Sequence, residues 1–289
     1  MQSAQRLVRR LAPGETGCLR GGDYRSDAEV AIDTPRISLT SYPGERATLH
    51  TRLWIEQGGD GVVISDLDID GRNPTNLPSP TVNADDVVIR GDDITNHHTT
   101  ICVSLGSPDT YGRAARTVIE HNRIHDCGRL PPTNQDHGIY VNSSDDAVIR
   151  GNRIYDNADR GVQLYPDSQG TLVSHNVIDR NGVGVIFGGS ETTTSNGNVV
   201  QDNVITNSRV RGNIDYSWGG AKGTGNVARH NCVGGGADLE EGILATAPFR
   251  RLADATHLAA FAATAAARGD LDLARTCARV LGFAAGHSR

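Results

Sequence analysis

Residues 147–156 read AVIRGNRIYD, and nearly the same ten-residue phrase occurs seven times between residues 62 and 235. Its third residue is apolar in every copy, and successive copies lie 24 to 30 residues apart. A repeat of this length is typical of a solenoid, in which each repeat buries its apolar face only against its neighbours. The other copies are VVISDLDIDG from Val62, VVIRGDDITN from Val87, TVIEHNRIHD from Thr117, TLVSHNVIDR from Thr171, NVVQDNVITN from Asn198 and NVARHNCVGG from Asn226.

Within each phrase, Val and Ile alternate with other residues on either side of a polar break, which favours two short strands over a helix. The sixth position carries Asp or Asn in six consecutive copies, whereas the first copy has Leu67. We interpret this residue as the left-handed residue of a sharp bend, whose amide also hydrogen-bonds from coil to coil in a ladder. The six residues are Asp92, Asn122, Asn152, Asn176, Asn203 and Asn231.

A second apolar-alternating stretch follows each phrase, so each coil is expected to hold about three short parallel strands. The sequence therefore predicts an all-β fold, a right-handed parallel β-helix. The stretches are TICVSLG from Thr100, GIYVNSS from Gly138, GVQLYPD from Gly161, GVGVIFG from Gly182 and a weaker copy, GNIDYSW, from Gly212.

These repeats resemble the right-handed parallel β-helix repeat proteins of the pectate lyase-like superfamily over about residues 7–236. The opening LVRRLAPGETGCLRGGDY is similar to that family's short N-terminal capping helix and first coil. The resemblance implies fold more than chemistry, because the superfamily includes lyases, hydrolases, epimerases and non-catalytic proteins. We therefore expect a capped β-helix over residues 1–236. Residues 237–289 are alanine-rich with apolar residues at helical spacing, and are expected to form a helical cap over the last coil.

Composition narrows the classes of partner. The formal charge of −6 argues against a nucleic-acid binder, and no apolar run is long enough to span a bilayer. The opening MQSAQRLVRRL lacks a signal peptide's apolar region. We expect a secreted or cell-surface protein whose leader has been removed, and a cytoplasmic location stays open. Five cysteines without CxxC spacing allow one disulfide that cannot be assigned. We expect a monomer that binds a polysaccharide.

Alignment of the second strands gathers chemically active residues on one face. Asp136 and Asp159 fall in one column with His98, and His137 and Arg160 fall in the next with Thr99 and Asn181. Further along the same strands, two columns of residues are expected to point outward. The first contains Cys102, Tyr140, Gln163 and Gly184, and the second contains Ser104, Asn142 and Tyr165. Two insertions, SPDTYGRAAR from Ser107 and CGRLPPTNQ from Cys127, are expected to form walls beside this face.

The resemblance to acidic-polysaccharide lyases implies three roles for these residues. Arg160, with Arg113 or Arg129 from the walls, is expected to neutralise a substrate carboxylate. His137 is the candidate base, and Tyr140 the candidate acid for the departing oxygen. The other candidate substrate-binding residues are His98, Asn142, Gln163 and Tyr165.

Alternatives remain open. Asp136 and Asp159 on adjacent coils are candidates for the carboxylate pair of a retaining glycosidase, and NQDHG from Asn134 resembles the NTDG motif of polygalacturonases, with His137 inserted. The same carboxylates are candidates to hold a Ca²⁺ ion that bridges protein and uronate, although no full oxygen cage is evident. A protein that binds polysaccharide without catalysis is the third hypothesis.

The scattered histidines are interpreted as solvated rather than metal-binding, and Asp66, Asp68 and Asp70 as a solubilising stripe.

Overall fold

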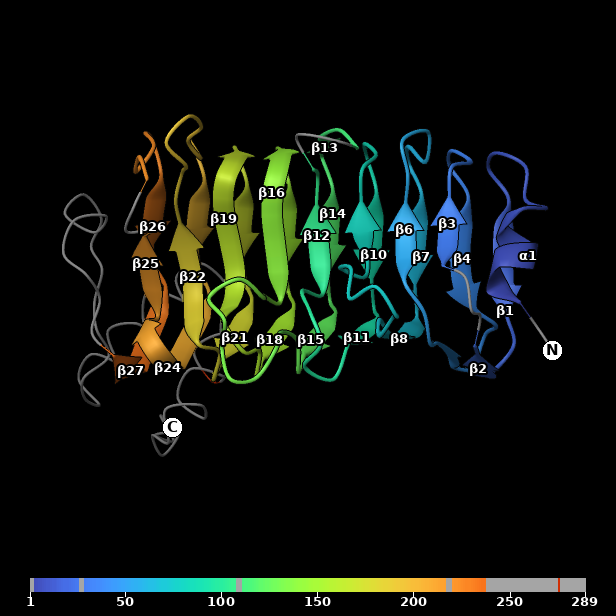
Figure 1. The fold of residues 1–289 in the computed structure, drawn as a ribbon, viewed down its shortest axis with the longest axis horizontal. Helices are drawn as coiled ribbons and strands as arrows, with labels where there is room; N and C mark the ends of the chain where they lie inside the picture. Colours follow the sequence, from blue (N-terminus) through green and yellow to red (C-terminus); the bar gives the residue numbers. More distant parts are fainter. Residues whose placement is uncertain (1–2, 26–28, 108–110, 217–219, 238–274, 276–289) are drawn as a thin grey trace, which may run out of the picture.

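The computed structural model describes residues 3–25, 29–107, 111–216, 220–237 and 275. Over these residues the chain winds as a right-handed parallel β-helix, which confirms the predicted fold class. The coils stack along one axis from the N-terminal end to β27 (Figure 1). No helix within these ranges is long and apolar enough to cross a bilayer. The cap expected over residues 237–289 lies outside the described residues, Ala237 and Arg275 apart.

Three parallel sheets run along the axis, and each coil contributes one strand to each sheet. Sheet A contains β1 (Thr16–Leu19), β4 (Ser38–Ser41), β7 (Val63–Ser65), β10 (Val88–Arg90), β14 (Val118–Glu120), β17 (Val148–Arg150), β20 (Leu172–Ser174), β23 (Val199–Gln201) and β26 (Val227–Arg229). Sheet B contains β2 (Gly22–Tyr24), β5 (Ala47–Leu49), β8 (Leu67–Asp70), β11 (Asp93–Thr95), β15 (Arg123–His125), β18 (Arg153–Tyr155), β21 (Val177–Asp179), β24 (Val204–Gly212) and β27 (Cys232–Ala237). Sheet C contains β3 (Val30–Ile32), β6 (Leu53–Ile55), β9 (Thr81–Val82), β12 (Val103–Leu105), β16 (Ile139–Asp145), β19 (Arg160–Gln169), β22 (Val183–Phe187) and β25 (Ile214–Tyr216), with β13 (Ala114–Ala115) paired to β16.

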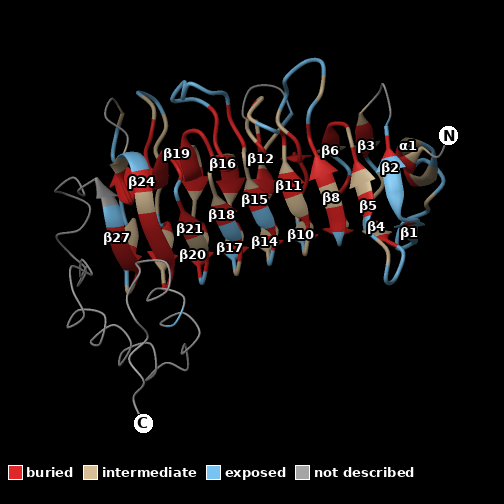
Figure 2. Ribbon diagram, turned by 90° about the horizontal axis from the view of Figure 1, so that it is seen from below, coloured by how far each residue is buried: buried red, intermediate tan, exposed pale blue. Residues whose placement is uncertain are grey.

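The core is a set of aliphatic stacks inside the coil. The third residue of each phrase points inward from sheet A, and Ile89, Ile119 and Ile149 are in register and fully buried. Burial of one such side chain contributes about 1.5–3 kcal/mol, so every added coil extends the same core. Buried segments recur in each strand of sheet B along the axis (Figure 2).

The first end of the stack is covered by α1 (Ala4–Val8), the capping helix that the family resemblance implied. Ser3 begins it as the N-cap, because its Oγ accepts the N–H of Arg6 at 3.2 Å. Ala4 and Val8 are buried in the core, so the helix closes the inside of the first coil.

The bend from sheet A to sheet B contains the predicted ladder, but the left-handed residue is not the asparagine. Positive φ occurs one residue earlier, for example at His121 (57°) and Gly151 (66°). Asn122 instead works through its side chain: Oδ1 accepts the N–H of Asp92 at 2.9 Å, and Nδ2 donates to Ile89 O and Asn152 Oδ1, both at 3.0 Å. The prediction that the asparagine itself takes the left-handed conformation is therefore wrong. The prediction that its side chain hydrogen-bonds from coil to coil in a ladder is confirmed.

Two further ladders occupy the other bends. Asn157 and Asn181 stack between sheets B and C, with Asn157 Nδ2 donating to Asn181 Oδ1 at 2.9 Å. Asn198 and Asn226 repeat this contact between sheets C and A, also at 2.9 Å. Buried amides thus satisfy main-chain groups at all three bends, which holds the coil cross-section constant.

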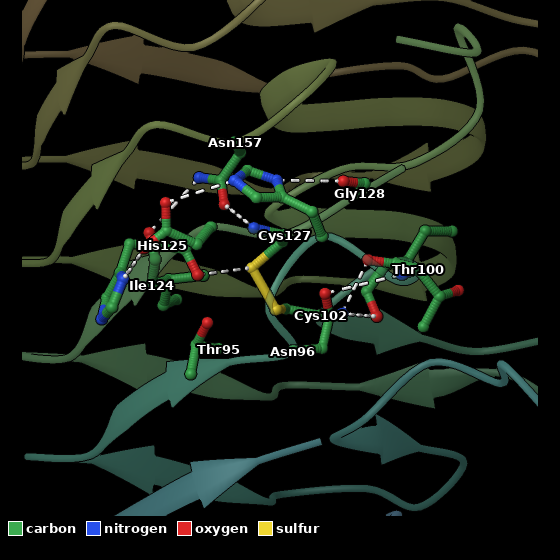
Figure 3. The surroundings of a disulfide bond; sticks show 12 residues. Thr95, Asn96, Thr100, Cys102, Ile124, His125, Cys127, Gly128 and Asn157 are labelled. Atoms are coloured by element: carbon green, nitrogen blue, oxygen red, sulfur yellow. Dashed lines mark hydrogen bonds and ion pairs between the residues drawn. A yellow bond between two sulfur atoms is a disulfide. The ribbon is translucent and has the colours of Figure 1, made fainter. Parts of the chain in front are cut away.

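The long loops flank sheet C on both edges. Residues 126–138 connect β15 to β16 at the edge shared with sheet B, and residues 106–107 and 111–113 lie at the edge that sheet C shares with sheet A. These two connections are seen at opposite ends of the sheet C strands (Figure 1). Cys102 and Cys127 form a disulfide at the base of the first loop, with their Cα atoms 5.7 Å apart (Figure 3). The sequence allowed one disulfide without assigning it, and the structure identifies Cys102 and Cys127 as a bonded pair.

Candidate functional site

The outward face of sheet C carries a column of side chains in register across five coils. Ser104, Tyr140, Gln163, Ile186 and Asp215 pair in succession. The sequence alignment placed Cys102 and Gly184 beside Tyr140 and Gln163, which is wrong by two residues in each case. The turns before these strands differ in length, and a two-residue slip preserves the inward and outward alternation, so the sequence pattern alone does not expose it.

His137 and Arg160 lie side by side on adjacent coils, as predicted, directly before β16 and within the start of β19. The carbonyl of Arg160 accepts the N–H of Gly138, and that of His137 accepts the N–H of Cys102, which fixes this alignment. His98, Thr99 and Asn181 do not share their columns. Asn181 pairs with Asn157 in a ladder instead.

His137 is 2% exposed and contacts Tyr140 edge to face, with ring centroids 5.4 Å apart. Burial, with a smaller effect from Arg160, lowers the pKa of His137 well below its usual value, so its imidazole is neutral. Burial, together with Tyr165, raises the pKa of Tyr140, so its phenol keeps its proton. The pair thus presents a neutral ring nitrogen beside a protonated hydroxyl group.

The guanidinium group of Arg160 is held by the loop above it. Arg160 Nη1 donates to the carbonyl of Asn134 at 2.7 Å, and Nη2 donates to Asn134 Oδ1. The side chain is 5% exposed, and this burial lowers its pKa. The guanidinium group that was expected to bind a substrate carboxylate is therefore already hydrogen-bonded to Asn134.

Three buried polar atoms at this place have no hydrogen-bond partner within the part of the chain that the structure describes. They are His137 Nδ1, Arg160 Nε and Gln163 Oε1. An unpaired buried polar atom costs about 1–3 kcal/mol, so three on neighbouring residues are unusual for a purely structural region. Such atoms are suited to bind water or a polar ligand.

Asp136 and Asp159 serve the loop. Asp159 Oδ2 accepts the main-chain N–H groups of Gln135 and Asp136 at 2.8 and 2.9 Å. The carboxylate of Asp136 accepts Arg129 Nε at 2.7 Å and the hydroxyl of Thr133 at 2.9 Å. The two aspartates therefore hold residues 129–136 in place beside Arg160, and their oxygens do not form a calcium cage. Among the described residues, no group of three or more His, Cys, Asp or Glu side chains is arranged to hold a metal ion.

The remaining predicted residues are spread around this centre. Arg113 comes from the opposite edge and is ion-paired with Asp145 at 2.6 Å and with Asp167. His98 lies at the base of the loop, where Nδ1 is 3.1 Å from the carbonyl of Gly128. Asn142 and Tyr165 lie further along β16 and β19, beside a register shift between those strands. The binding roles of these residues stay predictions.

Sequence reasoning missed the partners that surround Arg160. Asn134 was read only as part of a motif, and Asp215 was not singled out. Asp215 is 3% exposed and pairs with Arg211 Nε at 2.8 Å. The stretch GNIDYSW was recognised as a weak repeat. Counted from its isoleucine, it would have placed Asp215 in the column of Tyr140 and Gln163.

His125 on sheet B was also misjudged as a solvated residue. It lies between Asp93 (Nε2–Oδ1, 2.7 Å) and Asp126 (Nδ1–Oδ2, 2.8 Å) and stacks on Tyr155 at 4.9 Å. The bond to Asp93 is the main cause that raises the pKa of His125, with Asp126 adding to it. Histidines such as His121 are explained by backbone conformation instead, because they occupy the left-handed position before a ladder asparagine.

With this geometry in hand, the coil stack defines the chain as a parallel β-helix protein that carries a loop-covered polar cluster on one sheet. The family described as "right handed beta helix region" matches residues 57–233, and the chain belongs to this family. A search of curated proteins found no match.

Solved structures of the same fold include polysaccharide lyases. The chain is similar to a PL6 alginate lyase determined with a trisaccharide (TM-score 0.55, 14% identity, 83% of this chain and 57% of that one). It is also similar to the pectate lyase Pel9A (TM-score 0.56, 13% identity, 88% and 74%) and to the alginate lyase AlyF-OU02 with G6 (TM-score 0.51, 14% identity, 82% and 57%). At these identities the likeness establishes the fold alone, and the chain spans little more than half of either alginate lyase.

Proposed function

We propose that this protein is a carbohydrate-active β-helix enzyme that cleaves an anionic, uronate-containing polysaccharide by β-elimination at the outward face of sheet C. The observation that carries the proposal is the grouping of His137, Tyr140 and Arg160, together with the unpaired atoms His137 Nδ1, Arg160 Nε and Gln163 Oε1. The resemblance of the fold to alginate and pectate lyases supports the substrate class.

The proposed chemistry needs one proton removed and one supplied. His137, neutral at working pH, takes the proton from the ring carbon beside the substrate carboxylate, the electron pair forms the new carbon–carbon double bond, and the glycosidic oxygen departs. Tyr140 keeps its proton and donates it to that oxygen. Arg160 stabilises the negative charge that develops on the carboxylate, once the substrate has replaced Asn134 as its partner.

A lyase is distinguished by its product. We expect pectate, alginate or a glycosaminoglycan to give an unsaturated uronate, detected by its ultraviolet absorbance. His137→Ala and Tyr140→Phe should each lower the rate about 10²–10⁴-fold, the usual contribution of a general acid or base. A matched control is Tyr155→Phe on sheet B. Unchanged activity in the His137 and Tyr140 variants would refute the site even if a lyase activity were found.

The hydrolase alternative predicts new reducing ends without ultraviolet absorbance, and loss of that activity in both Asp136→Asn and Asp159→Asn. It is less well supported, because both carboxylates accept hydrogen bonds from the loop. A binding protein would retain uronate affinity and release neither product. Secretion is the location we infer, because the Cys102–Cys127 disulfide is typical of proteins from oxidising compartments.

A further inference from the structure

A second polar site lies on sheet B near the N-terminal end of the coil stack. A depression of about 450 Å³ is lined there by side chains from three successive coils, namely Arg25, His50, Asp70, Arg72, Asn73 and Pro74. This volume lies in the range of small-ligand pockets. The lining residues take no part in the cluster around His137.

Asp70 is the buried floor of this depression. Its side chain is only 7% exposed, and three basic groups converge on it. His50 Nδ1 lies 3.1 Å from Asp70 Oδ2, Arg72 Nη2 lies 2.5 Å from the same oxygen, and His97 Nε2 lies 3.8 Å from it. One carboxylate is thus shared by several potential cations.

The rim adds positive charge. Arg72 and Arg25 have side chains that are 52% and 64% exposed, and Arg25 is only loosely paired with Asp23 at 3.7 Å. Asp23 also contacts His50 Nε2 at 2.7 Å. Two arginines thus balance two carboxylates here, and His50 and His97 add positive charge when protonated.

The depression shares an edge with the candidate site. The loop that carries Arg72 and Asn73 joins sheet B to sheet C, as does the loop of residues 126–138 that carries His137. His50 follows β5 and His137 follows β15, three coils later, which corresponds to about 14 Å along the axis at a strand spacing of about 4.8 Å. An oligosaccharide lying along this edge can reach both places.

We propose that this depression is a distal subsite that binds the carboxylate of a uronate residue, several sugar units away from the bond that is cleaved. Arg25 and Arg72 form charge-assisted hydrogen bonds with that carboxylate, and Asp70, which also contacts His50, fixes Arg72 from below. The inference rests on the proposed function for its substrate class, but it concerns binding and requires no bond cleavage.

The test is calorimetric titration of the full chain with uronate oligosaccharides of increasing length, alongside neutral oligosaccharides of matched length. We expect Arg25→Gln/Arg72→Gln to weaken binding of the long uronate oligomers about tenfold or more and to leave binding of the shortest unchanged. Arg153→Gln, an exposed arginine on the same sheet, is the control. Arg25→Gln alone, at an exposed position, should weaken binding in the same direction if the double variant is unstable.

Equal affinity of the wild type and both variants for long uronate oligomers would overturn the subsite, as would equal binding of neutral oligomers or no binding at all. The outcome is separable from the proposed function. Length-dependent uronate binding that requires Arg25 and Arg72 supports the subsite even if no unsaturated product is ever released. Lyase activity with unaltered binding in the variants supports the function and refutes the subsite.

Discussion

Asp92 continues the asparagine ladder directly before Asn122, because its main-chain N–H donates to Asn122 Oδ1 at 2.9 Å and its own Oδ1 accepts the N–H of Leu67 at 2.8 Å. Where Asn122 has an amide nitrogen that donates twice, Asp92 has a second oxygen, and this Oδ2 has no hydrogen-bond partner among the described residues. Burial raises the pKa of Asp92 to about 8. The folded protein therefore favours a protonated carboxyl group at a position built for an amide.

We predict that Asp92→Asn stabilises the protein in alkaline solution. The unfolded carboxyl ionises near pH 4 and the folded one near pH 8. The wild type should therefore lose stability as pH rises between these values, by at most about 1.4 kcal/mol per pH unit. At pH 8–9 the variant should be more stable by about 1–3 kcal/mol, and near pH 5 the two should be similar. Urea unfolding at both pH values measures this, with Glu191→Gln as the exposed control. A variant less stable at pH 9 would contradict the assignment.

The ladder itself should be costly to interrupt. Asn152 is 1% exposed; its Oδ1 accepts the N–H and the side-chain amide of Asn122, and its Nδ2 donates to the carbonyl of Ile119 and to Asn176 Oδ1. Asn152→Ala should destabilise the fold by about 2–4 kcal/mol, because main-chain groups on two coils lose their partners. Asn142→Ala, at a half-buried position on sheet C, should change stability by less than about 1 kcal/mol. Comparable losses of unfolding free energy in both variants would show that the ladder contributes no more to stability than an ordinary half-buried asparagine.

The sequence predicted the coil better than the site, for a physical reason. Core positions repeat in every coil and are constrained by the same neighbours, so apolar periodicity locates residues such as Ile119 and Ile149 directly. The position before the ladder holds Gly91 and Gly151 in two copies and His121 in another, and the glycines already indicated a positive φ there. The repeats therefore contained enough information to locate the left-handed residue, but it was assigned one position too late along the chain.

The site depends on what does not repeat. His137 and Arg160 aligned correctly because each is followed by a glycine and then by a strand in matching register, although the connections before β16 and β19 differ in length. Asn134 caps Arg160 from an insertion found in one coil only, and no periodic pattern reports such a contact. The burial of His137, which decides its protonation, was equally invisible in the sequence.

The low pKa of His137 has a consequence for the pH profile of any activity. A base must be neutral in the free enzyme, and this imidazole stays neutral well below the usual histidine value of about 6.5. We expect kcat/KM for uronate cleavage to persist as pH falls through 6.5 and to decline only at more acidic pH. An acidic limb at the ordinary histidine value, lost in His137→Ala, would show that the residue is more exposed than described.

The loop of residues 126–138 should become more mobile when Asp159, which accepts hydrogen bonds from it, is replaced. Asp159 Oδ2 accepts two successive main-chain N–H groups, those of Gln135 and Asp136. Asp159→Ala should therefore speed tryptic cleavage after Arg129 severalfold at a trypsin concentration that leaves the coils intact. Asp156→Ala, which removes a half-buried partner of the exposed Arg180, is the matched control. If both variants are cut at the wild-type rate, the loop is held by contacts other than Asp159.

The disulfide at the base of the same loop gives a final prediction. Cys102 and Cys127 are fully buried, and the bond closes a chain segment with a sequence separation of 25. Removing it as Cys102→Ser/Cys127→Ser should cost about 3 kcal/mol of unfolding free energy, because the unfolded chain regains the freedom of that segment. Reduction of the wild type should lower the stability in the same direction. Cys18→Ser, which removes an exposed free thiol, should have no such effect. Equal unfolding midpoints for the double serine variant and the wild type would mean that the ladders, with Asn157 Oδ1 accepting the N–H of Cys127 at 3.0 Å, already hold this bend without the covalent bond.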